Sequence, residues 1–190
     1  MKHVQNHNND NYVLNYILSM NKFHDACNNS DTPSISSKRN KNSKLFIKPP
    51  KILLVEDVAI IQKTHTLFLE YLGCRVDLAS DGFEAIELFQ NAYDLILLDI
   101  SLPSKNGLTK TGIDVTREIR CFEQETGTRR NTIIALTAFG DTLLDECIKS
   151  GCDAFYEKPL LLEALKGVLQ HWLPKLASKQ SDALNKCRNK

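Results

Sequence analysis

Four apolar runs of this chain each end in polar residues of types that can do chemistry. In chain order these residues are Glu56 with Asp57, then Asp99, Thr137 and Lys158. A carboxylate at the end of a buried run is costly unless partners balance its charge. In open parallel sheets, ligands bind outside the carboxyl ends of the strands. We therefore expect these five residues to meet in one site.

The acidic residues among them could hold a metal ion. Glu56 and Asp57 are adjacent, and neighbouring acids repel each other unless a cation balances them. With Asp99 they would offer three carboxyl groups, and oxygen ligands of this kind suit Mg²⁺. Alternatively, the adjacent pair only caps a helix expected to begin near Ala59. Convergence with Asp99 favours the functional hypothesis.

The remaining polar residues suit the binding of a phosphoryl group. The hydroxyl of Thr137 can donate to a phosphoryl oxygen, and the small Ala138 lets its backbone N–H approach as well. Thr137 could also be an ordinary strand residue. Lys158, which precedes Pro159, can place a point charge on a phosphate. The alternative for Lys158 is a surface lysine before a proline that opens a helix.

Composition and charge argue against several other classes of protein. Lys and Arg against Asp and Glu number seven to three in residues 1–48, twelve to nineteen in 49–173 and five to one in 174–190. An acidic body between basic tails is unlike a nucleic-acid-binding domain. No apolar run approaches the length of a membrane span, so a cytoplasmic location is expected. The glycine-rich motifs of dinucleotide and P-loop sites are absent. The six cysteines form no C-x-x-C pair and are expected to be structural thiols.

Short apolar runs alternate five times with segments of helical spacing. This alternation predicts an α/β fold, a doubly wound five-stranded parallel sheet covered on both faces by helices, although it does not choose the strand order. The predicted strands are 51–56, 74–79, 94–99, 131–137 and 153–157, and the predicted helices are 59–72, 81–91, 112–125, 141–150 and 160–172.

The chain is predicted to have three parts. Residues 1–48 form a basic, Asn-rich extension of largely disordered composition, in which residues 12–23 could form one amphipathic helix. Residues 49–174 form the folded domain, and residues 175–190 form a short basic tail.

The ordered set of motifs resembles the receiver domain of two-component response regulators, over about residues 50–173. The sequence of these motifs is most similar to that of receivers attached to hybrid histidine kinases. The resemblance implies a flavodoxin-like sheet of order 2-1-3-4-5, with its site at the switch point. Supporting motifs are Leu53-Leu54-Val55-Glu56-Asp57, Leu72-Gly73-Cys74, Ala79-Ser80-Asp81-Gly82-Phe83-Glu84-Ala85, Leu97-Leu98-Asp99-Ile100-Ser101-Leu102-Pro103 and Ser150-Gly151-Cys152-Asp153.

The same resemblance implies a role for each site residue. Asp99 would accept a phosphoryl group from a phosphohistidine, and Thr137 and Phe155 would switch afterwards. Lys158 and Ala138 would bind the phosphoryl group. Mg²⁺ would be held by Glu56, Asp57, Asp99 and the backbone carbonyl of Ser101.

A receiver is a phosphoacceptor signalling domain rather than an enzyme, apart from self-catalysed phosphorylation and dephosphorylation. The expected partners are a histidine kinase or a histidine phosphotransfer protein and a downstream protein target, without direct contact to nucleic acid or membrane. Residues 1–48 lack the pattern of dimerisation helices, so kinase activity is not expected within this chain. The tail after Trp172 is too short for a DNA-binding unit.

One departure from the family pattern lies close to Asp99. After Asn106-Gly107 the chain has Leu108-Thr109-Lys110-Thr111, an insertion of about five residues relative to the short turn that the family usually has. Long loops beside sites are often functional.

Two other functions stay open. A pseudo-receiver would bind partners without phosphorylation. A phosphatase that uses an aspartyl phosphate usually has a second Asp two residues after the nucleophile, where this chain has Ser101.

Overall fold

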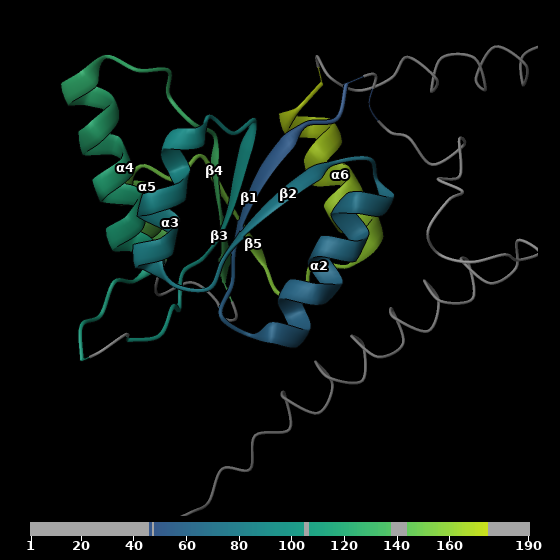
Figure 1. Cartoon of the computed structure of the whole chain (residues 1–190), viewed down its shortest axis with the longest axis horizontal. Coiled ribbons are helices and arrows are strands. Elements are labelled where there is room, and N and C mark those ends of the chain that lie inside the picture. Colours follow the sequence, from purple (N-terminus) through teal and green to yellow (C-terminus); the bar gives the residue numbers. More distant parts are fainter. Residues whose placement is uncertain (1–45, 47, 105–106, 138–143, 175–190) are drawn as a thin grey trace, which may run out of the picture.

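The structure is a computed structural model that describes residues 46, 48–104, 107–137 and 144–174 (Figure 1). The predicted helix over residues 12–23, nearly all of the N-terminal extension and the basic tail over residues 175–190 lie outside the described residues. Within the described part, no helix combines the length and the apolar character needed to cross a membrane.

The predicted fold class is confirmed, with five parallel strands in the order β2-β1-β3-β4-β5. Val55 at the end of β1 pairs with Ala79 of β2 and Leu98 of β3, and Asp99 pairs with Leu136 of β4. The carboxyl ends of these strands therefore lie at one edge. The strands are β1 (Lys51–Val55), β2 (Arg75–Ala79), β3 (Leu95–Asp99), β4 (Ile133–Thr137) and β5 (Ala154–Glu157).

Helices cover both faces of the sheet, with α2 and α6 on one side and α3, α4 and α5 on the other (Figure 1). Their bounds agree with the predicted ones to within about three residues. The helix predicted from residue 81 ends as a 3-10 turn, and Ala92 follows it with a φ of 55°. The elements are α2 (Ala59–Tyr71), α3 (Gly82–Leu88), η2 (Phe89–Asn91), α4 (Gly112–Thr126), α5 (Leu144–Ser150) and α6 (Leu162–Trp172).

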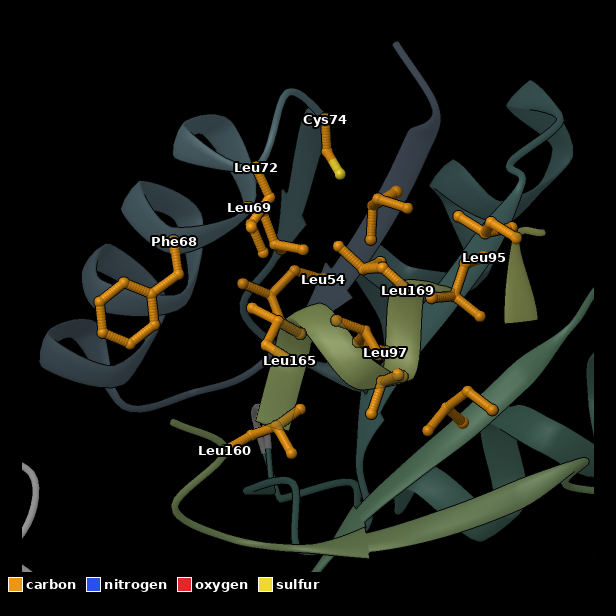
Figure 2. Packing of buried hydrophobic residues seen from close by; sticks show 14 of the residues in the cluster. Leu54, Phe68, Leu69, Leu72, Cys74, Leu95, Leu97, Leu160, Leu165 and Leu169 are labelled. Carbon is orange, nitrogen blue, oxygen red and sulfur yellow. The ribbon is translucent and has the colours of Figure 1, made fainter. Parts of the chain in front are cut away.

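Because side chains alternate along a strand, the apolar runs supply both faces of the sheet at once. Leu54 and Leu97 pack under α2 and α6 (Figure 2). Their chain neighbours Leu53 and Leu98 pack under α3 and α4 on the opposite face. This double burial explains why the central strands are apolar throughout and why the sheet edge that holds the polar residues is rigidly placed.

One core residue belongs to the segment that precedes β1. Phe46 is 3% exposed and lies in the same cluster as Phe68, Leu72 and Leu173, between α2 and α6. Its aromatic ring therefore contributes to the core although it lies before the first strand.

We expect Phe46→Ala to lower the free energy of unfolding by about 3 kcal/mol, because it removes a buried aromatic side chain and leaves a cavity. Urea unfolding measures the change. The matched control is Leu108→Ala, since Leu108 is 62% exposed and its truncation should change stability by no more than about 0.5 kcal/mol. Equal effects of the two substitutions would show that Phe46 does not stabilise the domain.

The buried face of α2 also contains a histidine. His65 is 2% exposed and lies among the buried residues of α2. Burial, with a smaller contribution from the charge of Lys158, lowers the pKa of His65 to about 4. His65 is therefore neutral in the folded protein near neutral pH.

This histidine should make the domain less stable in mild acid. Its folded pKa lies below the unfolded one, so the stability it contributes is present above about pH 6.5 and is lost as the pH falls towards 4. We expect His65 to account for a loss of about 2 kcal/mol between pH 7 and pH 5. Urea unfolding at both values should show a smaller loss in His65→Leu than in the native chain. The control His171→Leu removes an exposed imidazole from α6 and should keep the native pH dependence.

Candidate functional site

The carboxyl edge of the sheet brings residues from four strands into one place. Glu56 follows β1, Asp99 ends β3, Thr137 ends β4 and Lys158 follows β5. Backbone hydrogen bonds extend the pairing beyond the strands and fix these positions. The N–H of Glu56 donates to the carbonyl of Ala79 at 3.0 Å, and the N–H of Lys158 donates to that of Thr137 at 2.7 Å.

The ammonium group of Lys158 is the centre of the site. Its Nζ donates to Oε2 of Glu56 and to Oδ2 of Asp99, each at 2.6 Å. All three residues are buried, with Glu56 0%, Asp99 3% and Lys158 8% exposed. Charge-assisted hydrogen bonds of this length are strong, and in a buried site little water screens them. The lysine therefore links β5 to both β1 and β3.

Among the described residues, the acidic groups of the site outnumber the basic ones. Burial by itself would lower the pKa of Lys158, but the carboxylates of Asp99 and Glu56 outweigh burial and hold that pKa above its ordinary value. The lysine therefore stays charged. Burial raises the pKa of Glu56 in spite of the neighbouring lysine. One ammonium group thus faces several acids, and an added positive charge would favour the ionised form of Glu56.

The three acids lie close enough together to share one cation. Glu56, Asp57 and Asp99 can each offer a carboxylate oxygen, and these oxygens lie within 4.8 Å of one another. Asp57 is only half-buried, so the cluster is open towards solvent on its side. A set of hard oxygen ligands next to an excess of negative charge fits a hard divalent cation. The residues present could therefore hold such an ion.

The two oxygens of Asp99 have different partners. Oδ2 accepts from Lys158, and Oδ1 accepts from the backbone N–H of Ser101 at 2.9 Å. These hydrogen bonds hold the carboxylate in one orientation at the end of β3. The structure therefore places Ser101 beside Asp99 through its N–H, while metal binding by the Ser101 carbonyl stays a prediction.

The residues predicted to switch lie at different places. Thr137 is 4% exposed at the end of β4, where it pairs with Glu157 of β5. Phe155 pairs with Ala135, two residues before Thr137, and its side chain is 39% exposed. Phe155 is thus exposed on β5, which is an edge strand of the sheet. Ala138 lies outside the described residues.

A close backbone contact at the start of α4 was not predicted from the sequence. Gly112, the first residue of α4, lies so close to β3 that a Cβ atom there would be 2.2 Å from the carbonyl oxygen of Asp99. Its N–H donates to the carbonyl of Ile100 at 3.0 Å. Any larger residue at position 112 would have to displace the backbone of Asp99.

The insertion before Gly112 ends in a capping box, which fixes where α4 begins. Thr111 Oγ1 accepts from the N–H of Asp114 at 3.2 Å, and the N–H of Thr111 donates to Asp114 Oδ2 at 3.0 Å. Lys110 forms an ion pair with Glu118 and lies over the ring of Phe83. The T-x-x-D spacing was the sequence signal for this helix start.

A second contact that the sequence did not predict holds Glu56 in place. The side-chain amide of Gln62 in α2 donates to the backbone carbonyl of Glu56 and to Oγ of Ser80, the latter at 3.2 Å. Oε1 of Glu56 accepts from the N–H of Val58 at 3.2 Å. The start of α2 thus contacts the backbone carbonyl and Oε1 of Glu56, while Lys158 contacts its Oε2.

Curated proteins similar to this chain are signalling proteins that are much longer than the matched region. Histidine kinase 5 of Arabidopsis thaliana is 36% identical over 152 residues, which cover 65% of this chain and 16% of that protein. Transcription factor SKN7 of Saccharomyces cerevisiae is 32% identical over 147 residues, which cover 75% of this chain and 22% of that protein. The chain therefore spans less than a quarter of the length of either relative.

Two solved structures that are similar to this chain contain receiver domains. A chain of the co-crystal structure of the Saccharomyces cerevisiae histidine phosphotransfer signaling protein Ypd1 and the receiver domain of Ssk1 matches with a TM-score of 0.61, 30% identity and coverage of 68% of this chain and 91% of that one. The receiver domain of the sensor histidine kinase PA1611 of Pseudomonas aeruginosa, with a magnesium ion in its active site cleft, matches with a TM-score of 0.58, 37% identity and coverage of 67% and 99%.

The family model of the response regulator receiver domain matches residues 52–170. This range contains the acidic cluster, Lys158 and all five strands apart from Lys51, the first residue of β1. The chain therefore belongs to the response regulator receiver domain family of two-component and phosphorelay signalling.

Proposed function

We propose that residues 49–174 form a receiver in which Asp99 accepts a phosphoryl group from a phosphohistidine. The donor would be a histidine kinase or a histidine phosphotransfer protein. The observation that carries the proposal is the buried Lys158, which contacts Asp99 and Glu56 at 2.6 Å beside a cluster of three acids. A buried glutamate with a raised pKa beside a charged lysine at the carboxyl ends of strands is typical of a reactive site.

In the proposed reaction a carboxylate oxygen of Asp99 attacks the phosphorus of the phosphohistidine. An O–P bond forms, the N–P bond breaks, and the histidine leaves in line with the attack. The N–H of Ser101 and the ammonium of Lys158 orient the carboxylate. As the O–P bond forms, Lys158 can transfer its hydrogen bond from Asp99 to a phosphoryl oxygen, so its charge stays neutralised.

Mg²⁺ is the cation proposed for the acidic cluster, held by Glu56, Asp57 and Asp99 with the backbone carbonyl of Ser101. Bound there, it would neutralise negative charge on the phosphoryl oxygens. The magnesium ion in the cleft of the similar PA1611 receiver supports this choice, as does the fit of the three carboxylates.

Signalling would follow from a local rearrangement after phosphorylation. The Thr137 hydroxyl and the backbone N–H of Ala138 would bind the new phosphoryl group, and Phe155 would move inward from its exposed position. The changed surface around α5 and β5 would then bind a downstream protein. Phe155 is 39% exposed, so an inward movement would remove apolar surface from water.

Incubation with a small phosphodonor and Mg²⁺ should add one phosphoryl group to Asp99. Intact-mass and peptide mass spectrometry measure the adduct. We expect no adduct in Asp99→Asn, and we expect Asp57→Asn to need a higher Mg²⁺ concentration because it removes one carboxylate ligand. An adduct that persists in Asp99→Asn would contradict the site. No adduct on the native chain would favour a pseudo-receiver, and turnover of phosphate esters would favour a phosphatase.

A protein donor must contact the surface next to the acidic cluster, and this surface contains exposed apolar side chains. Val58 and Ile60, which follow Asp57 at the start of α2, are 42% and 55% exposed. Apolar residues exposed beside a reactive site are typical of a docking surface. We therefore propose that the phosphodonor protein binds over the start of α2. The similar structure that contains Ypd1 and a receiver supports a donor of this class.

We expect Ile60→Glu to slow phosphorylation by a histidine phosphotransfer protein at least about tenfold, because a buried charge at an interface costs more than 1.4 kcal/mol. Phosphorylation by a small phosphodonor should be unchanged, since Ile60 is not part of the site. The matched control is Tyr71→Glu at the far end of α2, where the side chain is 37% exposed. If Ile60→Glu and Tyr71→Glu have equal rates with the protein donor, the donor docks elsewhere.

A further inference from the structure

Two cysteines occupy the contact positions of the motif that ends α5. The N–H of Cys152 donates to the carbonyl of Cys147 at 3.1 Å, and the N–H of Gly151 donates to that of Ile148 at 3.0 Å. Gly151 has a φ of 100°. This is the Schellman arrangement, in which the residue after the glycine packs on the helix residue five positions earlier. Here both contacting side chains are thiols.

The surroundings of the two thiols differ. Cys147 is 1% exposed and packs with Ile100, Ile113 and Ala135, and Cys152 lies half-buried against this cluster. The hydroxyl of Thr116 is 3.4 Å from Sγ of Cys152, and that of Ser150 is 3.7 Å away. Cys152 is therefore a polar-lined thiol with access to solvent, whereas Cys147 is an interior one.

We propose that Cys147 and Cys152 are a reversible dithiol pair that a low-molecular-weight disulfide oxidises to an intramolecular disulfide. Both thiols are free in the structure. Disulfides join residues whose Cα atoms lie roughly 4–7 Å apart, and a direct backbone hydrogen bond between Cys147 and Cys152 keeps their backbones close. Cys152 packs against the cluster that contains Cys147, so the bond needs little movement of the chain.

The order of the two steps follows from exposure. The thiolate of Cys152 attacks one sulfur of the external disulfide, whose S–S bond breaks and releases one thiol. Burial, together with the neighbouring Cys152, raises the pKa of Cys147 to about 11, so Cys147 reacts second. Its thiolate attacks Sγ of Cys152 and releases the second thiol. In sum, two protein thiols and one external disulfide give one protein disulfide and two external thiols.

The bridge would restrain the junction between α5 and β5. Cys147 lies in the last turn of α5, and Cys152 lies three residues before Phe155. The cluster that holds both thiols includes Ile100, the residue after Asp99, and Ala135, two residues before Thr137. Oxidation would thus tighten a part of the core that adjoins the site, and formation of the bridge itself does not depend on phosphorylation.

The test treats the full chain with oxidised glutathione, blocks the remaining thiols in denaturant and digests the protein with trypsin without reduction. Trypsin cuts after Arg130, Lys149 and Lys166 but not before Pro159, so the two cysteines fall in separate peptides. We expect a disulfide-linked pair of peptides 131–149 and 150–166 that disappears on reduction. In Cys147→Ser, peptide 150–166 should instead carry glutathione.

Cys121 provides an internal control because it is exposed on α4 and contacts the carboxylate of Glu125 rather than another thiol. It should carry glutathione in the same sample. In Cys152→Ser, Cys147 should stay reduced, because its thiol is buried. The proposal fails if Cys121 carries glutathione while Cys147 and Cys152 both remain free thiols. It also fails if glutathione stays on Cys152 of the native chain without transfer to Cys147.

Discussion

The buried ammonium of Lys158 is the interaction on which the site depends. In the order β1-β3-β4-β5, β5 is two strands from β3 and three from β1, or roughly 10 and 14 Å at the usual strand spacing. Only a long side chain on β5 can cross the end of β4 and reach Asp99. Glu56, on the more distant strand, has a longer side chain than Asp99 and so can reach Lys158 as well. Removing one partner of such a buried group typically costs about 3–5 kcal/mol. The strand order and the lengths of these side chains must therefore match for the three charged groups to meet.

This constraint also connects the core to the chemistry. Apolar side chains on both faces of β1 and β3 hold the strand ends in place and exclude water from beneath them. The low local dielectric strengthens the contacts of Lys158 and at the same time makes the unbalanced acids expensive. A rigid, dry sheet thus creates the excess of negative charge that a cation relieves. Each additional carboxylate should raise the affinity for a cation and lower the stability of the cation-free fold, so the two properties should be inversely related here.

The sequence predicts the parts of the structure that depend on local pattern or on strand ends. Alternation of apolar runs predicted the fold class, and the meeting of Glu56, Asp99 and Lys158 followed from parallel strands ending at one edge. The strand order came from the resemblance to receivers, because alternation does not distinguish among several orders. The burial of Phe46 could not be predicted, since the run Leu45-Phe46-Ile47 is too short to show a periodicity that picks out one buried residue. The burial of His65 depends on how α2 packs, which no local pattern encodes.

The contact between Gly112 and the Asp99 carbonyl has a practical consequence for protein engineering. The chain must return to the same point after the extended turn, and the capping box of Thr111 and Asp114 re-establishes the helix whatever the length of the preceding segment. The turn before Lys110 is thus a natural site for grafting a peptide epitope or a fluorophore attachment sequence. A label inserted there would report from beside Asp99, while α4 and the sheet edge would keep their positions.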